Sequence, residues 1–227
     1  MQNLYYNLRR WQVILLCAVF ALSLWSVYSN KYADNLDLPK SVRISIPEGY
    51  TNAEIAELFD ERFVYFNKEE FINNAPQGRM FPDTYYVGLY LTALQFVEIL
   101  ERTFDNKITP FVEEIESSGH PLEDIIMMAS ILEAEVRSDE DMRKVSDILW
   151  KRLDINMALQ VDSAMETYER PGFPDLPLGN PGLRSILSAL RPTSTEYWYF
   201  LTDKAGTVYY GEDFEEHKVN RAKYLNQ

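Results

Sequence analysis

The longest apolar stretch of the chain lies close to its beginning. Residues Trp11 to Tyr28, "WQVILLCAVFALSLWSVY", contain no charged residue, and the run is long enough to span a bilayer as a helix. Arg9 and Arg10 precede it, and arginines at one end of a membrane helix hold that end in the cytoplasm. The pattern predicts a single-pass anchor over residues 1–30, with the rest of the chain outside the cytoplasm. The alternative is a cleaved signal peptide, although the segment after the run lacks a clear cleavage pattern.

A polar linker at residues 31–40 leads into a segment in which strand and helix patterns alternate. Apolar and polar residues alternate from Val42 to Ile46, and Thr51 or Asn52 can cap the helix that follows. The pattern predicts, in order, a strand at 42–46, helices at 51–59 and 67–75, an aromatic extended segment before residue 92, and a helix at 93–104. We therefore expect one small unit of strands and helices at 41–88.

The second half of the chain begins with helical spacing. The pattern predicts helices at 121–137 and 138–154, a strand at 157–162, a proline- and glycine-rich loop at 170–182, a helix at 185–190, two strands joined by a turn at 204–206, and a last helix from Phe214. In the strand at 157–162, Gln160 and Asp162 would project from one face. The expected fold class is α+β, with a mixed helix and strand domain at 89–227.

Composition narrows the chemistry that the chain can perform. Of 227 residues, 46% are hydrophobic and 25% charged, which is typical of a globular protein with a real core. The single cysteine, Cys17, lies in the apolar run, and the two histidines are far apart in sequence, so we expect no metal site and no cofactor. Without Arg9 and Arg10, 20 Lys and Arg stand against 35 Asp and Glu. This acidic balance argues against nucleic acid and anionic lipid as partners.

Two glutamates stand at the end of the apolar helix "ASILEAEVRS". A helix turns 100° per residue, which places Glu135 in the middle of the apolar side and Glu133 on the opposite, polar side. A carboxyl group among apolar side chains loses hydration, and this favours the protonated form that a general acid needs. The alternative for Glu135 is contact with water or with Arg137 or Arg143. For Glu133 we expect contact with water, with a supporting role left open.

Several motifs follow one another in a characteristic order. They are Glu133 and Glu135 in Ala-Ser-Ile-x-Glu-x-Glu, Arg143 to Val145, Arg152-Leu153, Met157 to Asp162, and Asn180-Pro-Gly182. With them the chain resembles the YceG-like family, the MltG-type endolytic lytic transglycosylases of the bacterial cell envelope. "IPEGYTNAEIAELF" is similar to the LysM-like unit of that family, and the C-terminal strands and the helix of His217 also match.

The resemblance implies an enzyme, a peptidoglycan lytic transglycosylase of cell wall assembly. Glu135 would protonate the glycosidic oxygen between N-acetylmuramic acid and N-acetylglucosamine and then, as carboxylate, take the proton of the muramyl C6 hydroxyl. A 1,6-anhydro end would form in a glycan cleft. The family also implies substrate contacts from Gln160 and Asp162, with Glu133 and Asn180 as further candidates, and the turn is the safer role for Asn180.

The remaining expectations concern partners, location and alternatives. The resemblance implies nascent glycan strands as substrate, glycan-polymerising enzymes as membrane partners, and the extracytoplasmic side of the bacterial inner membrane as location. The segment between Asp162 and Asn180 is shorter than in the family. A non-catalytic glycan-binding or scaffold protein is therefore one alternative. A hydrolase that pairs Glu135 with Glu133 or Asp162 is the other.

Overall fold

The computed structural model describes Leu22, Ser23, Trp25 and residues 41–225. The chain divides into two units, residues 1–40 and 41–227, and Leu22, Ser23 and Trp25 are helical. Within the described residues, no helix combines the length and the apolar character needed to cross a membrane. Most of the anchor and the whole linker predicted at 1–40 lie outside the described residues.

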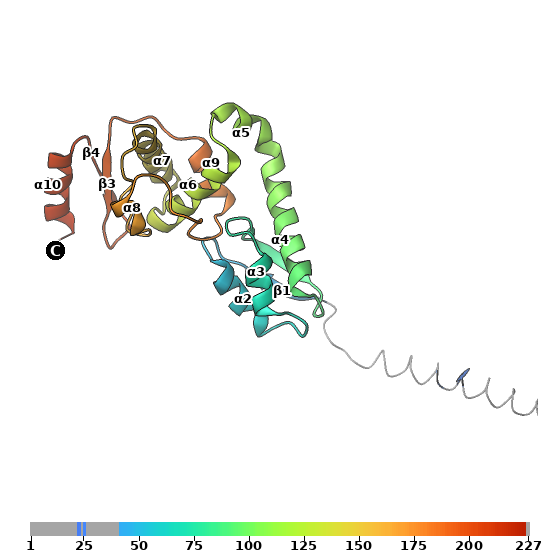
Figure 1. Cartoon of the computed structure of the whole chain (residues 1–227). Coiled ribbons are helices and arrows are strands. Elements are labelled where there is room, and N and C mark those ends of the chain that lie inside the picture. Colours follow the sequence, from blue (N-terminus) through green and yellow to red (C-terminus); the bar gives the residue numbers. More distant parts are fainter. Residues whose placement is uncertain (1–21, 24, 26–40, 226–227) are drawn as a thin grey trace, which may run out of the picture. The chain divides into compact units, whose positions relative to one another are not determined.

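The first part of the unit 41–227 is an antiparallel pair of strands with two helices between them in sequence (Figure 1). The elements are β1 (Val42–Ser45), α2 (Asn52–Asp60), α3 (Lys68–Asn74) and β2 (Thr84–Val87), with Val42 paired to Val87. Thr51 caps α2 in a capping box with Glu54, which confirms the predicted cap. Phenylalanine rings dominate this N-terminal core, and the Phe59 and Phe96 centroids lie 4.4 Å apart.

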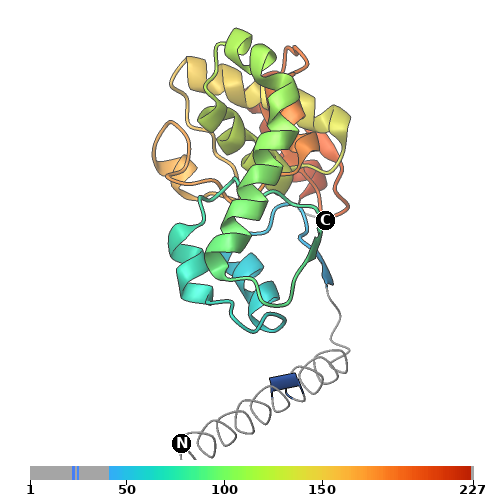
Figure 2. The ribbon, with the colours of Figure 1, turned by 90° about the vertical axis from the view of Figure 1, so that its right-hand side faces the viewer.

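Helix α4 (Ala93–Ile108) belongs to two hydrophobic cores. Phe96 and Leu100 pack into the N-terminal core, whereas Phe104 and Ile108, further along the same helix, pack into a larger C-terminal core. Figure 2 shows α4 running between the two parts of the unit. The short helices η1 (Thr109–Phe111) and α5 (Val112–Ser118) follow. The predicted domain boundary between residues 88 and 89 thus falls just before a helix that serves both cores.

The C-terminal core is built around helix α6 (Leu122–Glu135), which packs against α7 (Asp139–Asp154) and α9 (Leu183–Leu190). Ser138, at the start of the helix predicted at 138–154, caps α7. Helix α6 is buried around almost its whole circumference, because seven of its residues within two turns have little or no exposed surface: Ile125, Ile126, Met128, Ala129, Ser130, Ile131 and Leu132. A helix of this kind has no single apolar side.

The chain ends with a hairpin and a helix. Strands β3 (Tyr199–Thr202) and β4 (Val208–Gly211) pair antiparallel, and α10 (Phe214–Tyr224) packs on both (Figure 1). Gly206 supplies the positive φ of +86° in the connecting turn. The predicted strands, turn and final helix are confirmed. Together with the helical core, they also confirm the α+β class.

The strand predicted at 157–162 is wrong. This segment is a loop, and Gln160 adopts φ +53°. Leu159 and Val161 are buried at 0% and 1% exposure, so the alternation of apolar and polar residues is real. No neighbouring strand pairs with the segment among the described residues; its backbone instead bonds to Thr167, beside the short helix α8 (Glu166–Glu169).

Candidate functional site

A cavity of about 410 Å³ opens beside the C-terminal end of α6. Its walls come from that end of α6, from α7, from the loop 157–163, from α8, from the β3–β4 hairpin and from α10. The polar residues that line it are Glu135, Arg152, Gln160, Asp162, Tyr168, Tyr199, Thr202, His217 and Arg221. Three of the five predicted site residues, Glu135, Gln160 and Asp162, therefore meet in one polar cavity.

Glu135 is the last residue of α6 and is partly buried. Its Oε1 accepts a hydrogen bond of 2.8 Å from the backbone N–H of Ser163, and its backbone oxygen accepts one of 3.3 Å from the Thr202 hydroxyl. Both partners are distant in sequence, and one lies on the loop 157–163 while the other lies on β3. The carboxylate is thus held at the junction of the elements that form the cavity.

Gln160 and Asp162 line the cavity from a loop rather than from a strand. The buried side chains of Leu159 and Val161 hold this loop against the core, so the residues between and beyond them face outward. The Tyr168 hydroxyl donates a hydrogen bond of 2.6 Å to Oδ1 of Asp162. Burial, together with the neighbouring Asp162 carboxylate, raises the pKa of Tyr168 to about 12. The phenol therefore stays protonated at neutral pH and acts as a hydrogen-bond donor.

Arg152 and Arg221 bring positive charge to the cavity. Arg152 is 3% exposed, and its guanidinium donates to the carbonyl oxygens of Trp198, at 2.7 and 3.0 Å, and of Leu159. It thereby ties the loop 157–163 to the chain that enters β3. His217, on α10, lies near Arg152 and Arg221, and partial burial together with these two charges lowers its pKa. The imidazole is consequently held in its neutral form.

Tyr168, Arg221 and the cavity role of Arg152 were missed by the sequence interpretation. His217 and Arg221 are four residues apart, so they share one face of α10. That spacing is a signal that the sequence carries, although nothing in it says which helix face meets the cavity. Arg152 stands in one of the motifs, but its role was not predictable, because the carbonyl groups that it binds come from parts of the chain that the fold alone brings together.

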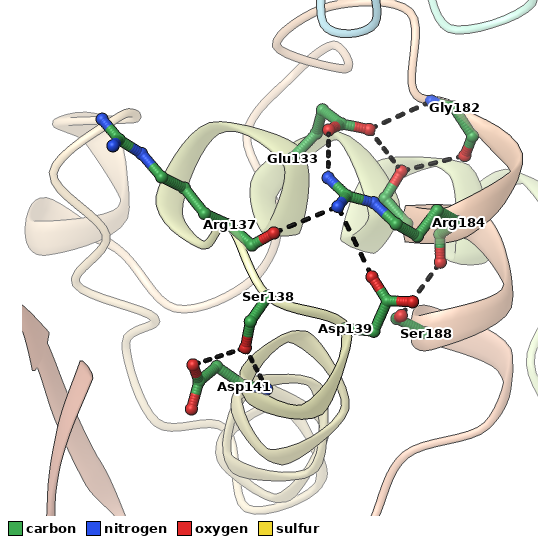
Figure 3. Close-up of polar contacts among 9 residues, drawn as sticks. Glu133, Arg137, Ser138, Asp139, Asp141, Gly182, Arg184 and Ser188 are labelled. Carbon is green, nitrogen blue, oxygen red and sulfur yellow. Dashed lines mark hydrogen bonds and ion pairs between the residues drawn. The ribbon is translucent and has the colours of Figure 1, made fainter. Parts of the chain in front are cut away.

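Glu133 points elsewhere, and the prediction that it faces water is wrong. Its side chain is only 9% exposed, and Oε2 accepts hydrogen bonds from the Gly182 N–H at 3.1 Å and the Ser185 hydroxyl at 2.7 Å (Figure 3). Arg184 lies 3.6 Å from its other carboxylate oxygen. The helical wheel failed because α9 covers the side of α6 that was expected to be solvated.

The surroundings of Glu133 form a second, smaller cavity of about 210 Å³. Glu48 also lines it, and burial together with the Glu133 charge raises the pKa of Glu48. Glu133 does not line the cavity of Glu135. A pairing of Glu133 with Glu135 across one glycosidic bond therefore has no geometric support.

Asn180 is fully buried and joins the two cores. Its amide nitrogen donates to the Tyr50 carbonyl at 2.8 Å and to Oδ1 of Asn52 at 2.9 Å, and its Oδ1 accepts from the Met80 N–H at 2.8 Å. The side chain lines neither cavity named above. The structure gives Asn180 a role in packing rather than the predicted contact with substrate, because every polar atom of its side chain is already bonded within the protein.

A partly buried carboxylate in a polar cavity, with hydroxyl and amide groups around it, defines a candidate acid–base site on an α+β scaffold. The YceG-like family model matches residues 25–166 and 164–223, and the chain belongs to this family. No metal-binding cluster of histidine, cysteine or acidic residues occurs within the part of the chain that the structure describes.

Curated relatives and a solved structure agree with this assignment. The chain is 26% identical over 207 residues to a protein named endolytic murein transglycosylase from Bacillus subtilis, covering 76% of this chain and 58% of the relative. It is 24% identical over 250 residues to a Streptococcus pneumoniae protein of the same name, covering 83% and 45%. The chain thus spans about half the length of the curated relatives it matches. A YceG-like protein from Listeria monocytogenes has the same fold, with a TM-score of 0.66 at 23% identity over 80% of this chain and 76% of that chain.

Proposed function

We propose that the chain is an endolytic murein transglycosylase that cleaves peptidoglycan glycan strands with Glu135 as its catalytic residue. The observation that carries this proposal is the position of Glu135, whose carboxylate lines a cavity together with Gln160, Asp162 and Tyr168. The names of the curated relatives support the reaction type. Their sequences support no particular residue, so the assignment of Glu135 rests on its position in the cavity and on the family motif.

The proposed reaction uses one carboxyl group twice. Protonated Glu135 donates its proton to the glycosidic oxygen between N-acetylmuramic acid and N-acetylglucosamine as the bond to C1 breaks. The muramyl C6 hydroxyl attacks C1 and gives its proton to the Glu135 carboxylate. The products are a 1,6-anhydromuramyl end and a free hydroxyl on the leaving sugar, and no water is consumed. The acid returns to its starting form, so a second carboxylate is not required.

The neighbours of Glu135 are suited to supporting roles. The Ser163 N–H occupies Oε1, and no hydrogen bond to Oε2 is found among residues 41–225, which leaves that oxygen for the glycosidic oxygen and the C6 hydroxyl. Gln160 and the pair of Tyr168 and Asp162 offer hydrogen-bonding groups to sugar hydroxyl or N-acetyl groups. Neutral His217 adds a further donor or acceptor at the α10 wall.

The location and partners belong to the same proposal. The apolar run from Trp11 to Tyr28 would anchor the chain in the bacterial inner membrane as a single pass, with the unit from Ser41 outside the cytoplasm. The β1-α2-α3-β2 segment would serve as a LysM-like unit. Nascent glycan strands would be the substrate, and the enzymes that polymerise them would be the membrane partners.

A hydrolase is the second candidate, and one observation favours it. Asp162 lines the same cavity as Glu135, so a second carboxylate is available to activate water. Its hydrogen bond with Tyr168 fixes the orientation of this second carboxylate. The two reactions differ in their products, because hydrolysis leaves reducing ends and transglycosylation leaves anhydro ends.

Mass spectrometry of the products tests the proposal. The membrane-embedded protein is incubated with purified, uncrosslinked glycan strands, and the wild type is compared with Glu135→Gln and with the control Glu140→Gln, an exposed glutamate of α7. Anhydromuramyl ends from the wild type and the control but not from Glu135→Gln support the proposal. Reducing ends establish the hydrolase instead, and an absence of products from folded wild type leaves a binding or scaffold protein.

A further inference from the structure

Four exposed apolar residues gather on the N-terminal part of the unit, in the loop after α2 and in the segment that leads from β2 into α4. They are Val64, Tyr65, Tyr90 and Leu94, with exposed fractions of 67%, 61%, 54% and 49%. The two segments touch, because the Val64 N–H donates to the Leu89 carbonyl at 3.4 Å and the rings of Tyr65 and Tyr90 lie 5.8 Å apart. We call these four residues the tyrosine patch.

The exposure of the tyrosine patch is imposed by its anchors. Phe63 and Phe66, which flank Val64 and Tyr65, are 5% and 8% exposed, and their rings lie 4.5 and 5.7 Å from that of Phe96. The loop is therefore fastened to the N-terminal core at two points, and the two residues between them are turned outward. An exposed apolar surface fastened at two points is typical of a binding surface.

The tyrosine patch lies at the end of the unit where the chain enters it. Val42, at the start of β1, pairs with Val87 at the end of β2, and the residues of the patch from Tyr90 onward follow shortly after. Both views draw this entry point and the loop after α2 at the same end of the unit (Figures 1 and 2). The residues that precede the entry point are the polar segment 29–40 and, before it, the apolar run that ends at Tyr28.

This position restricts what the patch can meet. Twelve residues, from Ser29 to Lys40, connect the apolar run to Ser41 and reach at most roughly 40 Å when fully extended. The patch itself is uncharged in a chain whose net charge is −13, so its contact with lipid would depend on apolar side chains rather than on attraction between charges. Tyrosine, with an apolar ring and a polar hydroxyl, suits the boundary between headgroups and acyl chains.

We infer that the tyrosine patch rests in the outer interfacial layer of the bilayer that holds the anchor. The inference depends on the proposed anchor, because the anchor brings the patch close to the bilayer surface. The patch would contact the boundary between headgroups and acyl chains, and this contact requires no lipid of particular charge. The patch then fixes the orientation of the unit, since an anchor alone would leave it free to turn.

Depth-dependent fluorescence quenching tests the inference on the full chain. Single-cysteine variants are made in a Cys17→Ser background, with Tyr65→Cys or Tyr90→Cys in the patch and Ile155→Cys, which is 61% exposed beyond α7, as the matched control. Each is labelled with an environment-sensitive fluorophore and reconstituted into phosphatidylcholine vesicles with or without a nitroxide lipid quencher near the headgroup. The chain with only its native Cys17, labelled and measured with a quencher deep in the acyl region, reports the anchor separately.

The quenching pattern distinguishes contact of the patch with lipid from membrane insertion of the anchor alone. Quenching and a blue shift at positions 65 and 90, without quenching at 155, are expected. Labels at 65 and 90 that behave like the label at 155, while Cys17 is quenched, overturn the inference and leave the anchor intact. A Cys17 label that escapes quenching overturns both. Emission at 65 and 90 that responds to added glycan strands but not to the lipid quencher overturns the inference in favour of a carbohydrate surface. Circular dichroism of every variant confirms that the fold is retained.

Discussion

Glu133 and Glu135 stand two positions apart on α6 and bind backbone N–H groups on different sides of that helix. Glu133 accepts from Gly182 at 3.1 Å, and Glu135 accepts from Ser163 at 2.8 Å. The first carboxylate is enclosed between α6 and α9, and the second opens onto a cavity of about 410 Å³. Two identical side chains therefore have separate functions, one in packing and one in the proposed chemistry.

Replacement of Glu133 by alanine should destabilise the protein. The Gly182 N–H and the Ser185 hydroxyl would lose their shared acceptor in a nearly closed site, at a cost of about 2 kcal/mol in the free energy of unfolding. Denaturant unfolding measures this cost. The control Glu140→Ala removes only an exposed ion pair with Lys144 and should change stability by less than about 0.5 kcal/mol. Equal effects of the two substitutions would contradict the packing role.

The same variant should also change the titration of Glu48. Burial and the Glu133 charge hold the pKa of Glu48 above its ordinary value, so removal of that charge lowers it. Carboxyl chemical shifts recorded across pH measure the change. A pKa of Glu48 that does not move in Glu133→Ala would show that the two carboxylates do not interact.

Replacement of Asn180 by alanine should be more costly. Three buried partners, the Met80 N–H, the Tyr50 carbonyl and the Asn52 amide oxygen, would lose a bond together, which we expect to cost on the order of 3 kcal/mol or more. Asn74→Ala is the matched control, because that exposed amide bonds only to the Glu70 carbonyl of its own helix. A thermal or chemical unfolding midpoint that falls equally in both variants would contradict the role of Asn180 in joining the two cores.

Replacement of Tyr168 by phenylalanine tests the cavity rather than the core. Tyr168 is 44% exposed, so the fold should be retained, while Asp162 loses its hydrogen bond of 2.6 Å. If the proposed function holds, the rate of glycan cleavage should fall about tenfold, which corresponds to roughly 1.4 kcal/mol. The control Tyr86→Phe changes a tyrosine that is 71% exposed on β2. An unchanged rate of cleavage by Tyr168→Phe would show that the hydrogen bond between Tyr168 and Asp162 has no role in the reaction.

His217 should make stability depend on pH in a defined direction. Its folded-state pKa lies below the ordinary value of 6.5, so the unfolded chain binds the proton more readily. This contribution to stability is present above pH 6.5 and is lost as the pH falls through the lower, folded-state pKa. The free energy of unfolding of His217→Gln should therefore decline less at acid pH than that of the wild type. Arg221→Gln removes one of the charges and should raise the pKa of His217 in NMR titration, and an unchanged pKa would contradict their contact.

The sequence predicted best those elements whose signals are local. The capping box of Thr51, the cap at Ser138 and the turn at Gly206 each depend on residues within a few positions. The alternation around Leu159 and Val161 was also read correctly, but a strand requires a partner, and alternation alone does not reveal whether the fold supplies one.

The candidate site was only partly predictable for the same reason. Glu135, Gln160 and Asp162 stand in recognisable motifs, and they do meet. Glu133 and Asn180 stand in motifs too, yet their environments are decided by α9 and by the turn at Tyr50, which come from distant parts of the chain. A helical wheel assumes one buried side, whereas α6 is enclosed on several.

The junction at Asn180 also determines how load would pass through the molecule. The Gly49 N–H donates to the Asn180 carbonyl at 2.9 Å, and the Asn180 N–H donates to the Tyr50 carbonyl at 2.9 Å, just after β1. Tension applied to the chain at Ser41 therefore crosses from β1 to the segment that leads into α9 without passing through α2, α3 or α4. The two cores would respond to such a pull as one mechanical body.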